Sequence, residues 1–127
     1  MQPTGAKMDF SESLLRHLPL RQLDIVFAET ICGLHVKHRD PFGIPGLVED
    51  SMGIVLVPPF SSESAPCAIQ AVHNRGFMFV RTLGDCGYRC CIFKGDWLLS
   101  DVRMPIRGNS MRVLLIAAIL AAQAMRG

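Results

Sequence analysis

The chain has 127 residues, a length typical of a single domain with a buried core. Half of the residues are hydrophobic, and 13 basic against 11 acidic side chains give a formal net charge of +2. This balance excludes an intrinsically disordered chain and a strongly basic protein that coats nucleic acid. The five cysteines are odd in number, two of them are adjacent, and no apolar segment precedes them. We therefore expect a reducing, cytoplasmic setting rather than a disulfide framework.

Two short helices are predicted in the first third of the chain. Asp9 and Glu12 have the spacing of a capping box and predict a helix over residues 10–17. Apolar residues at helical spacing predict a second helix, which Gly33 would end: Leu20, Leu23, Phe27 and Ile31. The pair is either a helix-turn-helix or a helical arm packed on the body. No helix carries a cluster of Arg, Asn or Gln, which argues against direct DNA binding.

A segment rich in Pro and Gly, residues 40–46, separates these helices from the rest of the chain. We place the domain boundary there, with a helical N-terminal arm over residues 1–41 and a β-rich domain over residues 42–127. Short strands are predicted at residues 54–57, 77–80, 97–99 and 113–116, between Gly-rich turns. The predicted class is therefore α+β and mainly β. Trp97 is expected in the core.

The last apolar run extends from Val113 to Ala122. It is too short to span a bilayer, so we expect no membrane association through it. A run of this kind is typical of a buried strand or helix that closes the core.

The pattern most indicative of chemistry is a pair of Gly-Asp steps, Gly84-Asp85 and Gly95-Asp96. A strand that ends in Gly-Asp can present the next side chain, here Cys86, from a tight turn. The second step is followed by an apolar run and predicts a turn that leads into a strand. Cys86 is the candidate nucleophile.

These residues resemble a known family, the LexA/UmuD-type self-cleaving peptidases of the bacterial DNA-damage response. The matching positions are Phe79-Val80-Arg81, Gly84-Asp85, Ile92, Gly95-Asp96, Leu98-Leu99 and Asp101. Upstream, residues 42–50 are similar to the family's cleavage segment, which would place the cleaved bond between Phe42 and Gly43. The resemblance implies a compact β-rich body like the family's C-terminal domain.

The chain departs from the family at the positions that carry the chemistry. The serine nucleophile falls on Cys86, and the methionine after it falls on Gly87, whose amide is the candidate oxyanion donor. A thiol ionises more readily than a hydroxyl and needs less help from a base. The family's catalytic lysine has no counterpart, since only Gln123 and Arg126 lie in that region and neither accepts a proton. Self-cleavage and a degenerate, non-cleaving relative both remain open.

The resemblance implies a regulator of the DNA-damage (SOS) response, a homodimer accessory to translesion synthesis. Its partners would be a recombinase filament on single-stranded DNA and a translesion polymerase subunit. The alternative is a catalytically inactive dimerisation module that acts as a transcriptional co-repressor. A third reading is a small β domain whose similarity is due to chance.

Other constellations in the sequence are weaker. A zinc site from Cys86, Cys90 and Cys91 with His35, His38 or His73 lacks the usual paired spacing, so buried thiols are favoured and no metal is predicted. Adjacent cysteines on a strand point to opposite faces, which argues against a redox pair at 90 and 91. Gly84 and Gly87 are not followed by a helix start, so they do not predict a phosphate-binding loop, and no cofactor is expected.

Overall fold

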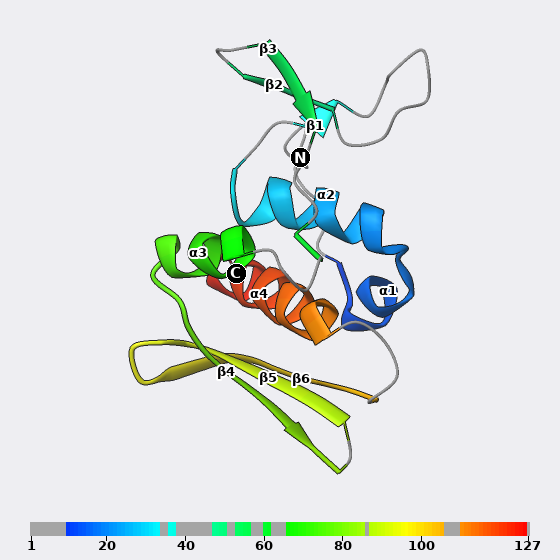
Figure 1. Ribbon diagram of the computed structural model, residues 1–127. Coiled ribbons are helices and arrows are strands. Elements are labelled where there is room, and N and C mark those ends of the chain that lie inside the picture. Colours follow the sequence, from blue (N-terminus) through cyan, green and yellow to red (C-terminus); the bar gives the residue numbers. More distant parts are fainter. Residues whose placement is uncertain are drawn as a thin grey trace, which may run out of the picture.

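The computed structural model of the protein describes residues 10–33, 36–37, 47–50, 53–56, 60–61, 66–85, 87–105 and 110–126 (Figure 1). The described residues form helices and strands in this order along the chain: α1 (Glu12–His17), α2 (Leu20–Thr30), β1 (Val36–Lys37), β2 (Leu47–Asp50), β3 (Gly53–Leu56), α3 (Pro66–Asn74), β4 (Met78–Gly84), β5 (Gly87–Lys94), β6 (Trp97–Met104) and α4 (Ser110–Arg126). The α+β class predicted from the sequence is confirmed.

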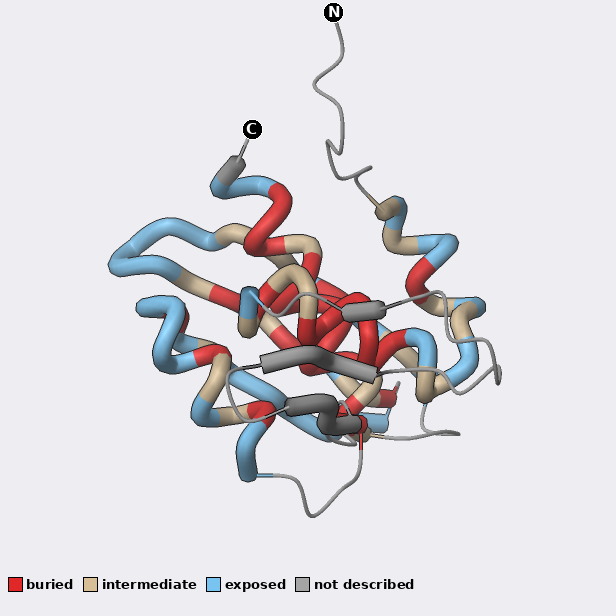
Figure 2. The backbone as a smooth tube through the Cα atoms, turned by 90° about the horizontal axis from the view of Figure 1, so that it is seen from above, coloured by how far each residue is buried: buried red, intermediate tan, exposed pale blue. Residues whose placement is uncertain are grey.

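Helix α4 lies at the centre, between the sheet of β4, β5 and β6 on one side and helix α2 on the other (Figure 1). The middle of α4 is buried almost all round, which Figure 2 shows as a red segment inside the molecule. The strand predicted at residues 113–116 is therefore wrong. A short apolar run does not distinguish a buried strand from a buried helix, and the many alanines that follow favour the helix. With a helix at its centre, the body is not shown to be mainly β.

Both helices predicted in the first third are present. Ser11 caps α1 by accepting a hydrogen bond from the amide of Leu14 at 3.1 Å. The capping box predicted at Asp9 and Glu12 is therefore wrong, because Ser11 is the N-cap residue and Glu12 begins the helix. Gly33, with φ of +69°, follows α2 in the left-handed conformation that glycine adopts easily. Leu23 and Phe27 of α2 are fully buried in the same core as α4. The boundary proposed between residues 41 and 42 falls outside the described residues.

Each of the two sheets is antiparallel with its strands in chain order, β1-β2-β3 and β4-β5-β6. Strands predicted at residues 54–57, 77–80 and 97–99 correspond to β3, β4 and β6. Helix α3, which buries Ala68 and Val72, was not predicted. The register between β5 and β6 shifts at Ile92 and Phe93, so that one extra residue of β6 is accommodated there.

Alternation along the central strand assigns the two faces of the larger sheet. Cys90 and Ile92 of β5 are fully buried and face α4, as does Ser100 of β6, whose hydroxyl donates to the carbonyl of Ala117 at 2.7 Å. Side chains of the intervening residues point away from α4. In Figure 1 this outer face is the lower side of the sheet, and no described element covers it.

Candidate functional site

The turn predicted to carry the nucleophile connects β4 to β5. Gly84 and Gly87 are paired across the hairpin, so only positions 85 and 86 separate the two strands. Asp85 is exposed in this turn. Cys86 itself lies outside the described residues. The prediction that this Gly-Asp step ends a strand at a tight turn is therefore confirmed for Gly84 and Asp85.

Gly87 is required by its surroundings. Its φ is +121°, a conformation that other residues rarely adopt, and an added Cβ would meet the carbonyl oxygen of Met104 and lie 3.0 Å from the Cα of Pro105. Gly84 has no such neighbour within 4 Å. A bulky residue such as the family's methionine would not fit at position 87 without moving the backbone. The role of the Gly87 amide as an oxyanion donor stays a prediction.

The second Gly-Asp step also forms a turn, as predicted. Gly95, with φ of +60°, and Asp96 connect β5 to β6, and Lys94 pairs with Trp97 across them. Trp97 is 77% exposed, so the expectation that it belongs to the core is wrong. The residue next to a turn at the end of a sheet has little around it to bury an indole ring. The predicted cleavage position, Phe42-Gly43, lies outside the described residues.

The region that would supply a catalytic base serves the fold instead. Gln123 on α4 is 8% exposed and accepts a hydrogen bond from the amide of Phe10 at 2.7 Å. The same side chain donates to the carbonyl of Phe10 at 2.9 Å. These two bonds fix the start of the N-terminal helices on α4. No lysine occurs in the sequence of α4, from Ser110 to Arg126.

The cysteines and histidine singled out in the sequence do not converge where the structure describes them. Cys90 is buried between the sheet and α4, and burial raises the pKa of its thiol to about 12. Cys91 is half-buried on the outer face, so the two adjacent thiols point to opposite sides, as expected. His73 stacks on Phe79 with ring centroids 5.5 Å apart. Within the described ranges, no three His, Cys, Asp or Glu side chains are grouped so as to hold a metal ion. Cys86 is not among those residues.

The sequence did not point to the outer face of the larger sheet, which carries several exposed large apolar side chains. Cross-strand pairing places its residues in three rows: Met78, Phe93 and Leu98; Val80, Cys91 and Asp101; Thr82, Arg89 and Arg103. Met78, Val80 and Leu98 are exposed by 62%, 55% and 54%. The outer face thus passes from an apolar row near the β5–β6 turn to a charged row near the β4–β5 turn.

The charged part of the outer face is partly neutralised from within. Arg89 donates from Nε and Nη2 to the two carboxylate oxygens of Asp101, at 2.9 and 2.8 Å. These hydrogen bonds lower the pKa of Asp101. Arg103 lies 3.9 Å from the same carboxylate. The pKa of the neighbouring Cys91 thiol is raised, first by burial and then by the charge of Asp101, which makes this thiol a poor nucleophile.

The apolar residues of β4 and β6 do not show in the sequence which face of the sheet is covered. The position of α4 decides which face is covered, because this helix packs on the face opposite to Met78 and Val80. None of the helices in the described part of the chain combines the length and hydropathy needed to cross a membrane.

Comparison with known proteins finds a solved structure of similar fold but no matching family. No protein-family model matches the chain, and no curated protein matches it. A solved structure of a phage protein from Bacillus cereus ATCC 14579 is similar, with a TM-score of 0.59 and 17% sequence identity. The match covers 83% of this chain and 92% of the phage protein. At this identity the likeness concerns the fold alone.

Proposed function

We propose that this protein is a dimerising interaction module without peptidase activity, a degenerate relative of the LexA/UmuD proteins that acts as a regulator. Two copies would associate through the outer face of the sheet formed by β4, β5 and β6. The observation that carries the proposal is the row of exposed apolar side chains at Met78 and Leu98, with Val80 beside it. Large apolar side chains grouped on one face are typical of a surface that another protein covers.

The charges on the outer face favour a second copy of the chain as the occupant. Asp101 accepts two hydrogen bonds from Arg89 and lies near Arg103, which leaves one net positive charge among the three and limits the repulsion between two identical faces. Arg103, which is 71% exposed, would also approach Asp101 of the other copy. A face that carries both an apolar row and charges of both signs is complementary to itself, as a two-fold interface requires.

The absence of a base supports the non-catalytic alternative over self-cleavage. In the resembled family a lysine takes the proton from the nucleophile. Here the corresponding region is α4, in which Gln123 is held by the backbone of Phe10. Since a phage protein has a similar fold, we place the module in a phage context rather than with a recombinase filament and a translesion polymerase.

The dimer is tested by sedimentation of the full chain at micromolar concentration. We expect a dimer for the unaltered protein and a shift to monomer for Val80→Asp, because the charge would lose its water at the interface without a partner. The expected weakening is at least about tenfold. Leu14→Asp, which alters an exposed leucine of α1, is the matched control and should leave the dimer intact. A monomeric unaltered protein would refute the proposal.

The lack of peptidase activity is tested by incubation at alkaline pH, where any thiolate at Cys86 is most populated. Mass spectrometry should find the chain intact, because no residue on α4 accepts the proton and an amide carbonyl is a poor electrophile. A fragment that begins at Gly43 and disappears in Cys86→Ala would overturn this part of the proposal. The sedimentation result would stand independently of it.

A further inference from the structure

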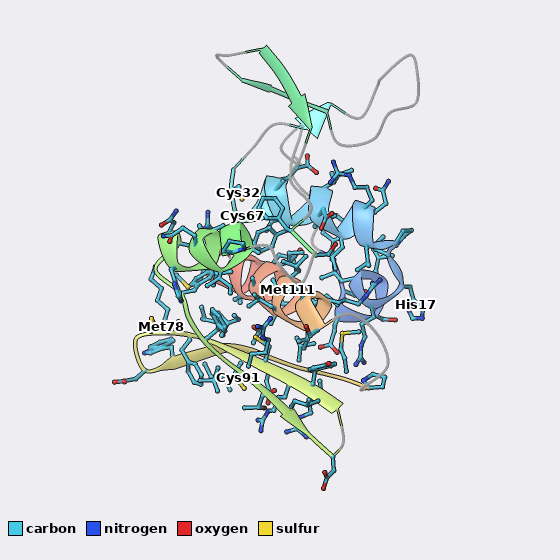
Figure 3. The ribbon with its side chains drawn as sticks, in the orientation of Figure 1. His17, Cys32, Cys67, Met78, Cys91 and Met111 are labelled. Atoms are coloured by element: carbon cyan, nitrogen blue, oxygen red, sulfur yellow. The ribbon has the colours of Figure 1, made fainter. Side chains whose placement is uncertain are left out.

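Two cysteines that are far apart in the sequence meet where α2 ends and α3 begins. Cys32 follows the last turn of α2, and Cys67 is the second residue of α3. Figure 3 labels both cysteines at this junction, and the charge of an ionised Cys67 acts on the thiol of Cys32. Both are free thiols, Cys32 half-buried and Cys67 exposed.

The contacts around Cys32 support this proximity. A shallow cavity of about 370 Å³ lies between the two helices, and it is lined by Ile31, Cys32, Gly33, Ala71, Asn74 and Arg75. Cys67 precedes Ala71 by four residues and Asn74 by seven, so it lies on the same face of α3. The helix face that carries Cys67 therefore points toward the end of α2.

Electrostatics agree with the geometry. The pKa of the Cys32 thiol is raised, first by burial and then by the negative charge that Cys67 carries when ionised. This repulsion disappears once Cys67 is joined to another sulfur, which leaves Cys32 better able to ionise. Exposure makes Cys67 the thiol that a reagent in solution reaches first.

We propose that Cys32 and Cys67 form a dithiol site that is oxidised to a reversible intramolecular disulfide by low-molecular-weight disulfides such as glutathione disulfide. The Cys67 thiolate attacks one sulfur of glutathione disulfide, forms a mixed disulfide and releases one glutathione thiolate. The Cys32 thiolate then attacks the Cys67 sulfur and releases the second glutathione. Two protein thiols are oxidised, the glutathione disulfide is reduced, and the two protons end on the released thiols.

The remaining described cysteines do not compete for this reaction. Cys90 is fully buried in the core. Cys91 lies on the outer face of the sheet, on the side away from α4 and α3. The Cys32–Cys67 bridge would enclose the segment that contains β1, β2 and β3 and the predicted cleavage position at Phe42-Gly43. Closing a loop of this length restricts the unfolded chain, so oxidation should stabilise the fold.

The test is incubation of the full chain with glutathione disulfide, followed by intact mass and thermal unfolding. We expect the protein to lose the mass of two hydrogen atoms, with Cys32 and Cys67 joined in the peptide map. The midpoint of unfolding should rise by about 10 °C and return on reduction. Cys91→Ser is the matched control and should behave as the unaltered protein.

The single variants separate the two steps. Cys32→Ser should stop at a stable glutathione adduct on Cys67, and Cys67→Ser should form no bridge. A stable adduct on Cys67 in the unaltered protein, or a bridge that involves another cysteine, would overturn the proposal. An unmodified protein under conditions that oxidise a small dithiol would do the same.

Discussion

The side chain of Gln123 shows how one residue joins the two ends of the described chain. Its amide bonds both backbone groups of Phe10, more than a hundred positions earlier in the sequence. Gln123→Leu removes both bonds and leaves the Phe10 amide and carbonyl without these partners in a half-buried place. We expect a loss of about 2 kcal/mol in the free energy of unfolding, measured with urea.

Gln123→Glu distinguishes the two bonds, because it keeps an acceptor for the Phe10 amide and loses the donor to the carbonyl. The stability of this variant should lie between that of Gln123→Leu and that of the unaltered chain. Gln70→Leu is the control, since Gln70 bonds Asn74 on the exposed side of α3. Equal losses for the leucine variants at the two positions would show that the Phe10 contact contributes nothing specific.

Asp24 makes the stability of the fold depend on pH. This buried carboxylate accepts a hydrogen bond from the amide of Ser61 at 2.8 Å and lies 3.4 Å from Arg21. Burial raises its pKa above the ordinary 3.8, although Ser61 and Arg21 act in the opposite direction. The folded state thus holds the proton more tightly than the unfolded chain. Asp24 favours folding below the unfolded pKa, and this contribution is lost as the pH rises through the folded pKa.

Asp24→Asn carries no titrating group at this position. The difference in urea midpoint between this variant and the unaltered protein should therefore shift in favour of Asn as the pH rises from about 3 to about 6. Asp96→Asn, in the exposed β5–β6 turn, controls for a general effect of removing an acid. A difference that does not change with pH would contradict the raised pKa.

At the scale of the elements, the β4–β5 hairpin offers a matched pair of glycines. Gly87→Ala would bring a Cβ against the backbone of Met104 and force a residue other than glycine into positive φ. We expect a cost of about 2 kcal/mol or more in the free energy of unfolding. Gly84→Ala, on the other side of the same turn and free of close neighbours, should change stability by less than about 0.5 kcal/mol. Urea denaturation of both variants measures the two losses of stability. Similar losses at positions 84 and 87 would contradict the prediction.

The elements that the sequence predicted well are those with a local signal. Apolar spacing and the flanking Pro19 and Gly33 located α1 and α2, and the Gly-Asp steps located the two turns of the larger sheet. Helix α3 also had such a signal, with Pro66 at its first position and Ala68 and Val72 four residues apart, but it was not recognised. Helix α4 was mistaken in part for a strand, since a fully buried segment has no polar face to show its period. The outer face and the Cys32–Cys67 pair depend on tertiary contacts, which no local pattern in the sequence contains.

For the whole molecule, α4 makes the N-terminal helices and the sheet depend on one another. Deletion of residues 1–33 would expose the side of α4 that Leu23 and Phe27 cover. We expect the shortened chain to lose its cooperative unfolding transition, observed by circular dichroism. Deletion of residues 1–9 leaves every described contact in place and is the control. A shortened chain that still unfolds cooperatively would show that residues 34–127 fold independently of the N-terminal helices.

The position of α4 in the sequence also bears on how the chain folds during synthesis. The sheet and helices α1 to α3 leave the ribosome before α4 does, and until then the inner face of the sheet has no partner. Until the 17 residues of α4 have been made and have emerged, Cys90, Ile92 and Val102 lack the helix that covers them in the folded protein. A chaperone that holds apolar strands would meet this protein before its core can close.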